Sequence, residues 1–141
     1  MMQRTKKQLV SFKMSRVKAK GSGIEQIMAR ALSAAGLRGY RKNLSTVLGT
    51  PDFCWKDKRV AVFCDSSFWH GYKWAREKKK IKVRKAFWFK KIEANIARDR
   101  RVTKALKSYG WKVFRYWDFE ITKDPIGCVQ NMLSGIDSKK N

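Results

Sequence analysis

Two short apolar runs separated by a charged turn set the framework of this sequence. The first run is Phe53-Cys54-Trp55, the second extends from Val60 to Cys64, and Lys56-Asp57-Lys58 lies between them. Apolar runs of this length around a short polar turn predict a β-hairpin, and the composition of the second run predicts that its strand is buried.

The open end of this hairpin is expected to bring two carboxylates together. If the turn centres on Asp57 and Lys58, antiparallel pairing sets Asp52 opposite Phe63, so that Asp52, Cys64 and Asp65 gather at one end. A carboxylate beside another acid and exposed backbone carbonyls is a setting that Mg²⁺ prefers, and nucleic-acid phosphates would supply further ligands. A turn-forming Pro-Asp pair is the alternative explanation of Asp52.

Further elements flank the hairpin. Ser22-Gly23-Ile24-Glu25 fits a capping box, and apolar residues at helical spacing follow it as far as Gly36. A long helix is predicted from Ala86 to Tyr109 and an aromatic, β-branched strand over 111–117. This order describes an α/β fold in which a small mixed sheet is flanked by helices. We divide the chain into a basic N-terminal arm at 1–20, one domain at 21–122, and a short C-terminal helix and tail at 123–141.

The charge balance indicates a polyanionic partner. Lys and Arg number 34 against 11 Asp and Glu, which gives a net charge of +23, yet 43% of the residues are hydrophobic, so the charge lies on a folded body. From residue 73 to 101, basic side chains interleave with Trp and Phe, which favours double-stranded DNA. No apolar run approaches the roughly 18 residues of a membrane helix, and no signal peptide opens the chain. We therefore expect a cytoplasmic protein with no membrane partner.

Cysteine and histidine are scarce in this chain. There are three cysteines, with no Cys-x-x-Cys pair, and one histidine. This spacing favours neither a disulfide framework nor a structural zinc site, so reduced thiols and no structural zinc are expected.

Two further side chains are candidates for chemistry. His70 follows two large aromatic residues after a predicted strand, and imidazole is the group whose ordinary pKa suits proton transfer at neutral pH. A structural histidine is the alternative. Asp99 falls on the inward side of the long helix, where a carboxylate needs a cation, a hydrogen-bond donor or a metal. Its alternative is a salt bridge to Arg98, Arg100 or Arg101.

Glu25, Phe68 and Trp69 each have a structural explanation at this point. The third position of a capping box is sufficient to explain Glu25. Phe68 and Trp69 could wedge between or stack on bases, although such a pair more commonly plugs a loop into the core.

The ordered set of motifs resembles the very-short-patch repair endonucleases, which nick DNA at T·G mismatches, and their homing-type endonuclease relatives. The resemblance spans roughly residues 11 to 120. It is carried by Met14-Ser15-Arg16, Glu25, Gly49-Thr50-Pro51-Asp52, Val60-Ala61-Val62-Phe63-Cys64-Asp65, Phe68-Trp69-His70-Gly71, Phe87-Trp88-Phe89-Lys90-Lys91-Ile92, Asn95-Ile96-Ala97-Arg98-Asp99-Arg100-Arg101 and Gly110-Trp111-Lys112-Val113.

The resemblance implies a restriction-endonuclease-like fold, with residues 21–122 as the endonuclease domain, and phosphodiester hydrolysis that depends on Mg²⁺ or Mn²⁺. It implies that Asp52 and the backbone carbonyl of Cys64 hold the metal and that Glu25 steadies a metal-bound water. His70 would be the general base, supported by Asp99 and Asp65. The DNA contacts that we expect come from Met14, Arg16, Phe68, Trp69, Lys90, Lys91, Arg98, Arg100 and Arg101.

The aromatic residues and Met14 match positions that the family inserts into the base stack from opposite grooves. Insertion would detect a mismatch because a poorly paired stack costs less to open. The chain departs from the family at the structural zinc site, whose ligands fall on Ser67, Tyr72, Trp74 and Phe119, so we expect aromatic packing in its place. Asp65 stands where the best-known enzymes carry a histidine.

Three functions remain open from the sequence. The first is a Mg²⁺-dependent endonuclease of the mismatch-nicking type, acting in bacterial or phage DNA with repair partner proteins. The second is a homing or mobile-element nuclease that cuts a specific duplex site with the same catalytic residues. The third is a non-catalytic basic DNA-binding protein, for which the net charge of +23 suffices.

Overall fold

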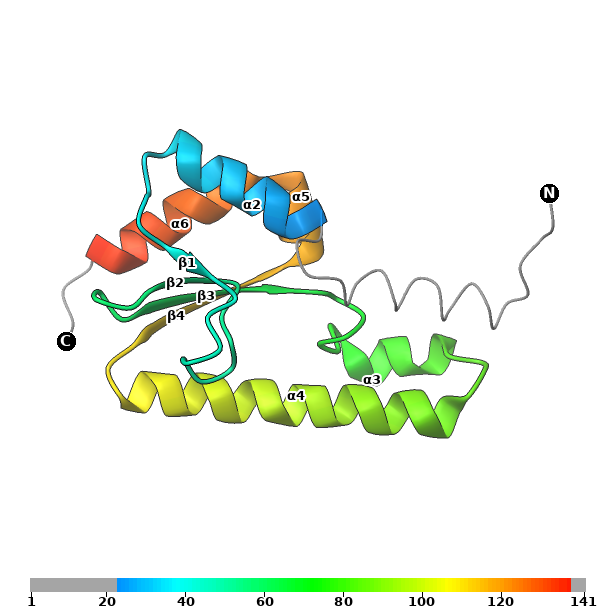
Figure 1. Ribbon diagram of the computed structural model, residues 1–141. Helices are drawn as coiled ribbons and strands as arrows, with labels where there is room; N and C mark the ends of the chain where they lie inside the picture. Colours follow the sequence, from blue (N-terminus) through cyan, green and yellow to red (C-terminus); the bar gives the residue numbers. More distant parts are fainter. Residues whose placement is uncertain (1–22, 138–141) are drawn as a thin grey trace.

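Residues 23–137 are described in the computed structural model, and their four strands form one sheet in the order β1-β2-β3-β4 (Figure 1). The strands are β1 (Arg41–Lys42), β2 (Phe53–Trp55), β3 (Val60–Asp65) and β4 (Lys112–Trp117). The first three pair antiparallel, and β4 pairs parallel with β3. The sheet is therefore mixed, as predicted.

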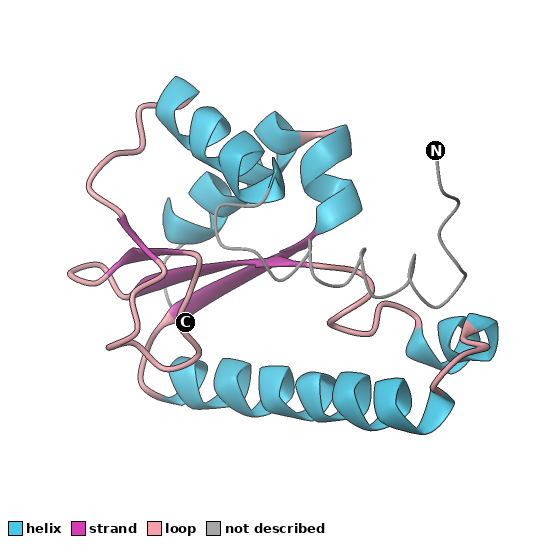
Figure 2. Ribbon diagram, turned by 45° about the vertical axis from the view of Figure 1, so that its right-hand side comes forward, coloured by secondary structure: helices cyan, strands magenta, loops and turns pink. Residues whose placement is uncertain are grey.

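Helices cover both faces of the sheet. One face carries α2 (Gly23–Ala34), α5 (Asp118–Lys123) and α6 (Pro125–Asp137), and the other carries α4 (Lys85–Ser108), as Figures 1 and 2 show. A short helix α3 (Trp74–Glu77) and a 3₁₀ turn η1 (Lys78–Lys80) lie beside the N-terminal half of α4. The segment between β3 and α4 thus contains two short helical turns.

Alternation along β3 divides the core into two layers. Val60 and Val62 belong to the layer under α2, α5 and α6, whereas Ala61 and Phe63 belong to the layer against α4. Every core residue of the strand is buried because both faces are covered. The same alternation turns Asp65 towards α4, where the sequence also places Asp99.

The hairpin has the predicted register. Phe53 pairs with Val62 and Trp55 with Val60, which sets Asp52 opposite Phe63. The long helix is confirmed within one residue at each end, and the predicted strand over 111–117 is confirmed as β4.

The C-terminal segment is more deeply integrated than a short helix and tail. Helix α6 is 13 residues long, and its Cys128, Val129 and Met132 are buried in the same core layer as Met28 and Leu32 of α2. The predicted arm at 1–20 and the Ser22 position of the capping box lie outside the described residues. Among residues 23–137, no helix is both long and apolar enough to cross a membrane.

Candidate active site

The turn before β2 delivers Asp52 to the open end of the hairpin. Gly49 has a φ of +81°, and a Cβ there would lie 2.5 Å from Val102 Cγ1, so the turn needs glycine to approach α4 this closely. Three residues later, Asp52 Oδ2 accepts a hydrogen bond of 2.7 Å from the backbone N–H of Cys64. The carboxylate is therefore fixed across the hairpin by more than a local Pro-Asp turn.

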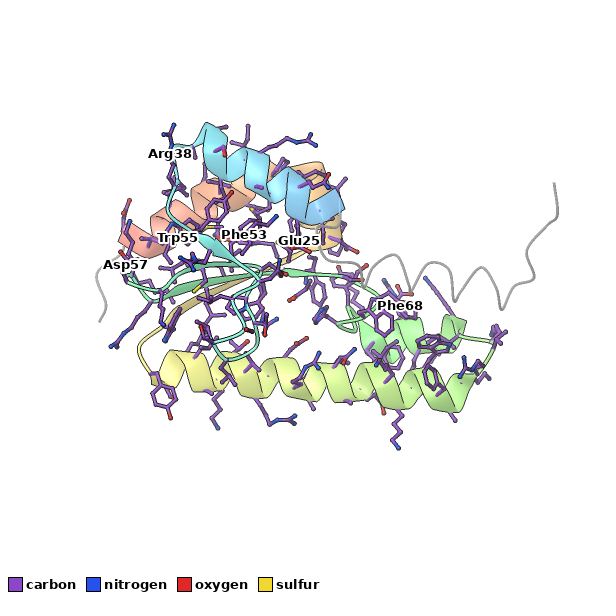
Figure 3. All side chains as sticks on the ribbon, in the orientation of Figure 1. Glu25, Arg38, Phe53, Trp55, Asp57 and Phe68 are labelled. Atoms are coloured by element: carbon purple, nitrogen blue, oxygen red, sulfur yellow. The ribbon has the colours of Figure 1, made fainter. Side chains whose placement is uncertain are left out.

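Three carboxylates share this end of the sheet. Burial raises the pKa of Asp52 to about 7; the hydrogen bond from Cys64 opposes the rise, and the charges of Glu25 and Asp65 add to it. Glu25, in the first turn of α2, is 7% exposed, and Asp65 is 5% exposed. Figure 3 shows Glu25 at the start of α2, above this end of the sheet. A bound cation would favour the ionised form of Asp52 against this cost.

His70 lies in a tight turn between β3 and α3. Its backbone N–H donates to the Ser66 carbonyl at 2.9 Å. Gly71 has a φ of +69°, and a Cβ there would overlap the Ile96 side chain of α4. From the same helix, Asn95 Nδ2 donates to the Trp69 carbonyl at 3.1 Å. The histidine is thus held by backbone contacts against α4.

The ring of His70 forms a hydrogen-bonded pair with Asp99. Nδ1 of His70 contacts Oδ2 of Asp99, and Oδ1 of Asp65 lies 3.8 Å from the same nitrogen. Burial lowers the pKa of His70, but the hydrogen bond to Asp99 and the charges of both carboxylates outweigh burial, so the net pKa is raised. Among the described residues, no hydrogen bond engages Nε2, which leaves that nitrogen for a substrate.

The side chains of Asp52, Asp65, His70 and Asp99 thus lie close together, and comparison with known proteins identifies the family of the chain. The sequence profile of the family described as DNA mismatch endonuclease Vsr matches residues 2–76, more than half of the chain. The chain belongs to the Vsr DNA mismatch endonuclease family.

Curated relatives agree with this assignment to the Vsr family. The type II nicking enzyme V.NmeDIP of Neisseria meningitidis serogroup C is 43% identical over 123 residues, 87% of this chain and 82% of that protein. The type II nicking enzyme V.HpaIIP of Haemophilus parainfluenzae is 45% identical over 108 residues, 77% and 76% of the two chains. The DNA mismatch endonuclease Vsr of Escherichia coli K12 is 32% identical over 105 residues, 74% and 66% of the two chains.

Vsr-family membership confirms two predictions. The fold is the restriction-endonuclease-like mixed sheet that the motifs implied, and the chain is a DNA endonuclease of the nicking type. The non-catalytic DNA-binding protein is thereby set aside. The homing-type alternative receives no support from these relatives.

Arg115 is a part of the Vsr-type site that sequence reasoning missed. Its Nη1 lies 3.1 Å from both carboxylate oxygens of Asp65 and 3.8 Å from Oδ1 of Asp99. Its Nε donates to Thr103 Oγ1 at 2.7 Å, and its guanidinium lies 4.0 Å from the Phe63 ring centroid. Asp99 thus pairs with His70 and Arg115, and within 23–137 no ion pair joins it to its neighbours Arg98, Arg100 or Arg101.

The two loop aromatics have different environments. Trp69 is 7% exposed and packs with Trp88 of α4, with ring centroids 5.7 Å apart. Phe68 is half-buried at the edge of this cluster and borders a cavity of about 370 Å³ that is also lined by Trp74 and Ile81. Figure 3 shows Phe68 above the α3 end of α4. Trp69 is packed into the core in this structure. Insertion of either ring into DNA stays a prediction.

The predicted basic contacts do not form one face of α4. The buried stripe contains Trp88, Ile92, Val102 and Leu106. At about 100° per residue, Lys91 and Arg98 lie on one flank of that stripe and Arg100 on the other, while Lys90 and Arg101 point away from the sheet. Met14 and Arg16 lie outside the described residues.

The carboxylate of Asp52 suits a hard cation whose remaining ligands are supplied by substrate and water. Within residues 23–137, no group of three or more His, Cys, Asp or Glu side chains is arranged to enclose a metal. Mg²⁺ does not need such a cage, since it is commonly bound by one or two carboxylates together with phosphate oxygens and water. Asp52, with Glu25 and Asp65 near enough to raise its pKa, fits that description.

Proposed function

We propose that this Vsr-family endonuclease nicks one strand of duplex DNA at mismatched base steps, by divalent-cation-dependent hydrolysis of a phosphodiester. The observation that carries the proposal is the convergence of a half-buried carboxylate, Asp52, and an oriented imidazole, His70, at one end of the sheet. A carboxylate to hold a cation and a base to activate water are the two parts that phosphodiester hydrolysis requires.

His70 would act as the general base. With Nδ1 engaged by Asp99, the lone pair of Nε2 is available to accept a proton from a water molecule. The water oxygen forms a new bond to phosphorus, the bond from phosphorus to the leaving sugar oxygen breaks, and the leaving oxygen takes a proton from solvent. Asp99 and Asp65 stabilise the imidazolium that results, because both carboxylates lie beside Nδ1.

Asp52 and the backbone carbonyl of Cys64 would hold the cation, for which Mg²⁺ or Mn²⁺ is the expected ion. When bound, it supplies stabilisation of the negative charge that develops on the phosphate and the leaving oxygen. Glu25 would hold a water of the hydrated cation, which accords with its buried position beside Asp52. Asp65 has a second role, since its contact with Arg115 secures the histidine side of the site.

Mismatch recognition is proposed for the loop that carries the catalytic histidine. Phe68 and Trp69 directly precede His70, so a base step opened by an aromatic ring would lie close to the scissile phosphate. The name DNA mismatch endonuclease Vsr of the E. coli relative supports this substrate. A cytoplasmic protein that works on bacterial DNA with repair partners is the setting that we infer from the bacterial relatives.

Paired oligonucleotides test the proposal. We expect single-turnover nicking of a duplex with one T·G mismatch to exceed nicking of its perfectly paired twin at least about tenfold, because opening the mismatched stack costs less. His70→Ala and Asp52→Ala proteins serve as matched controls that should bind but not cut. Equal cleavage of both duplexes would contradict mismatch recognition, and cutting of both strands of the paired duplex would favour the homing-type alternative.

A further inference from the structure

The turn from Ser67 to Tyr72, which contains His70, is anchored at the junction between β4 and α5. The backbone N–H and the Oγ of Ser67 both donate to Oδ2 of Asp118, at 3.1 and 3.2 Å. The N–H of Tyr72 donates back to the Ser67 carbonyl at 2.9 Å. Ser67 is therefore fixed directly to Asp118, 51 positions later in the chain, and the other end of the turn is held through Ser67.

An aromatic cluster completes this anchor. The Tyr72 ring meets the edges of Trp117 and Phe119, with centroid distances of 5.1 and 4.7 Å. Trp117 and Phe119 are themselves nearly parallel, with an interplanar angle of 6° and a centroid distance of 6.5 Å. Edge-to-face contacts of this kind fix ring orientation as well as burying apolar surface.

At the four positions where the family carries its structural zinc ligands, this chain has side chains that do not fit zinc. Zinc takes thiolate, imidazole or carboxylate ligands, whereas Ser67, Tyr72, Trp74 and Phe119 offer two hydroxyls, an indole and a benzene ring. Trp74 is engaged elsewhere, since its Nε1 donates to Glu93 at 2.9 Å and its ring contacts Phe89.

Near this turn the described chain adds the Asp118 carboxylate but no complete set of zinc ligands. Cys54 and Cys128 are buried in opposite core layers, and His70 is paired with Asp99. Across residues 23–137, no cluster of three metal-ligating side chains is formed.

We propose that Ser67, Tyr72, Trp117, Asp118 and Phe119 form a metal-free clasp that positions His70 for DNA cleavage. The inference rests on the proposed role of His70. The clasp secures the side of the turn opposite the contacts from Asn95 and Ile96, so the histidine is held between α4 and the start of α5. Displacement of a catalytic group by about 1 Å can slow a reaction about 100-fold, so loosening one side should affect the chemical step.

Paired variants test the clasp. Tyr72→Leu and Asp118→Ala remove the ring and the acceptor, and we expect each to slow single-turnover nicking at saturating enzyme by about 10- to 100-fold while duplex affinity changes less than about threefold. The matched controls Tyr72→Phe and Asp118→Asn keep the ring and an acceptor oxygen, and they should retain a rate close to that of the unmodified protein. If Tyr72→Leu does not fold, Asp118→Ala decides the outcome.

Two measurements other than activity, hydrogen exchange and zinc content, test the clasp independently of the proposed function. Backbone amides of residues 67–72 should exchange hydrogen faster in Tyr72→Leu and Asp118→Ala than in their controls. The purified protein should carry far less than one zinc per chain, and a zinc-specific chelator added with excess Mg²⁺ should leave both exchange and nicking unchanged. Stoichiometric zinc, or unchanged rate and exchange in both variants, would overturn the clasp. A protein that never nicks would instead count against the proposed function, while zinc content and exchange would still decide the clasp.

Discussion

At the scale of single residues, Asp99 decides which nitrogen of His70 stays available. Its carboxylate occupies Nδ1, so Nε2 carries the lone pair that can accept a proton. The hydrogen bond that His70 Nδ1 donates to Asp99 and the nearby carboxylate charges outweigh burial and raise the pKa of His70 above its usual 6.5. Because the base must be unprotonated, the nicking rate should rise with pH through this raised pKa.

The variant Asp99→Asn tests the pairing of Asp99 with His70. The amide keeps an acceptor oxygen but loses the charge, so the pKa of His70 should fall and the acidic limb of the pH–rate profile should move to lower pH. The maximal rate should fall about 100-fold, since the imidazolium loses its stabilising partner. The pH dependence of single-turnover nicking measures both effects, with Lys104→Gln, an exposed change on the same helix, as control. An acidic limb that does not move would contradict the pairing.

Asp52 should lower the stability of the fold when its carboxylate is ionised and no cation is bound. A carboxyl whose pKa is higher in the folded chain than in the unfolded chain stabilises the fold below the unfolded pKa. That contribution is lost as the pH rises towards about 7, the folded pKa of Asp52. Without cation, Asp52→Asn should therefore be more stable than the unmodified protein by about 1 to 3 kcal/mol at pH 8, with little difference at pH 4. Urea unfolding in EDTA at both pH values measures this, and equal or lower stability of the variant at pH 8 would contradict it.

At the scale of elements, β4 contributes as much to the site as the loops do. Its parallel pairing with β3 sets Arg115 beside Phe63, and alternation turns the guanidinium towards α4. Arg115 thereby joins Asp65 of β3 to Asp99 of α4. The strand itself was predictable from its aromatic and β-branched content, but this ion pair depends on a strand pairing 50 residues apart.

Arg115→Met should remove the cation that Asp65 and Asp99 share. Leaving the buried Asp65 without it should destabilise the fold by about 1 to 3 kcal/mol. The double variant Asp65→Asn with Arg115→Met should recover part of that loss, because it leaves no uncompensated charge. Denaturant unfolding of the two single variants and the double variant measures the coupling. Strictly additive losses would show that the two side chains act independently.

We predict that the lysine-rich turn between α3 and α4 binds DNA phosphates. Lys79 and Lys82 are exposed there, and Lys82 lines the same cavity as Phe68. Figures 1 and 3 show that α3 and Phe68 lie on the same side of the molecule. Replacing both with Gln should lower the slope of log affinity against log salt by up to about 2, one unit for each phosphate that a lysine no longer neutralises. The rate at saturating protein should stay the same.

The control for this change lies at the other end of the sheet. Lys56 and Lys58 flank Asp57 in the turn between β2 and β3, far from α3 in Figures 1 and 3. Replacing both with Gln removes the same charge away from the site, so the salt slope should change less. Equal effects of the two double variants would show that only net charge matters.

At the scale of the whole molecule, local periodicity was sufficient to predict most elements. The helix after residue 22, the hairpin register, α4 and β4 each follow from a strong pattern within one segment. Helix α6 was underestimated because its apolar residues are few, and their burial depends on α2, α5 and β4, which pack against it. The sequence likewise could not decide whether Trp69 packs in the core or stacks on bases, because large aromatic side chains serve both purposes. In the structure it packs on Trp88.

The charges of the molecule are unevenly distributed. A chain of net charge +23 concentrates three carboxylates at one end of its sheet, around Asp52. The basic surface attracts duplex DNA, and the acidic cluster repels the phosphate unless a cation lies between them. DNA binding should therefore tolerate removal of divalent cations better than cleavage does.

Conversion of supercoiled plasmid carrying a T·G mismatch tests the assignment of cleavage to Asp52 and His70 most directly. The unmodified protein with Mg²⁺ should yield open-circular DNA, and EDTA, Asp52→Ala and His70→Ala should each abolish that product while DNA retardation persists. Nicking that continues in EDTA, or that is as fast in His70→Ala as in the unmodified protein, would contradict the assignment of the chemistry to this site.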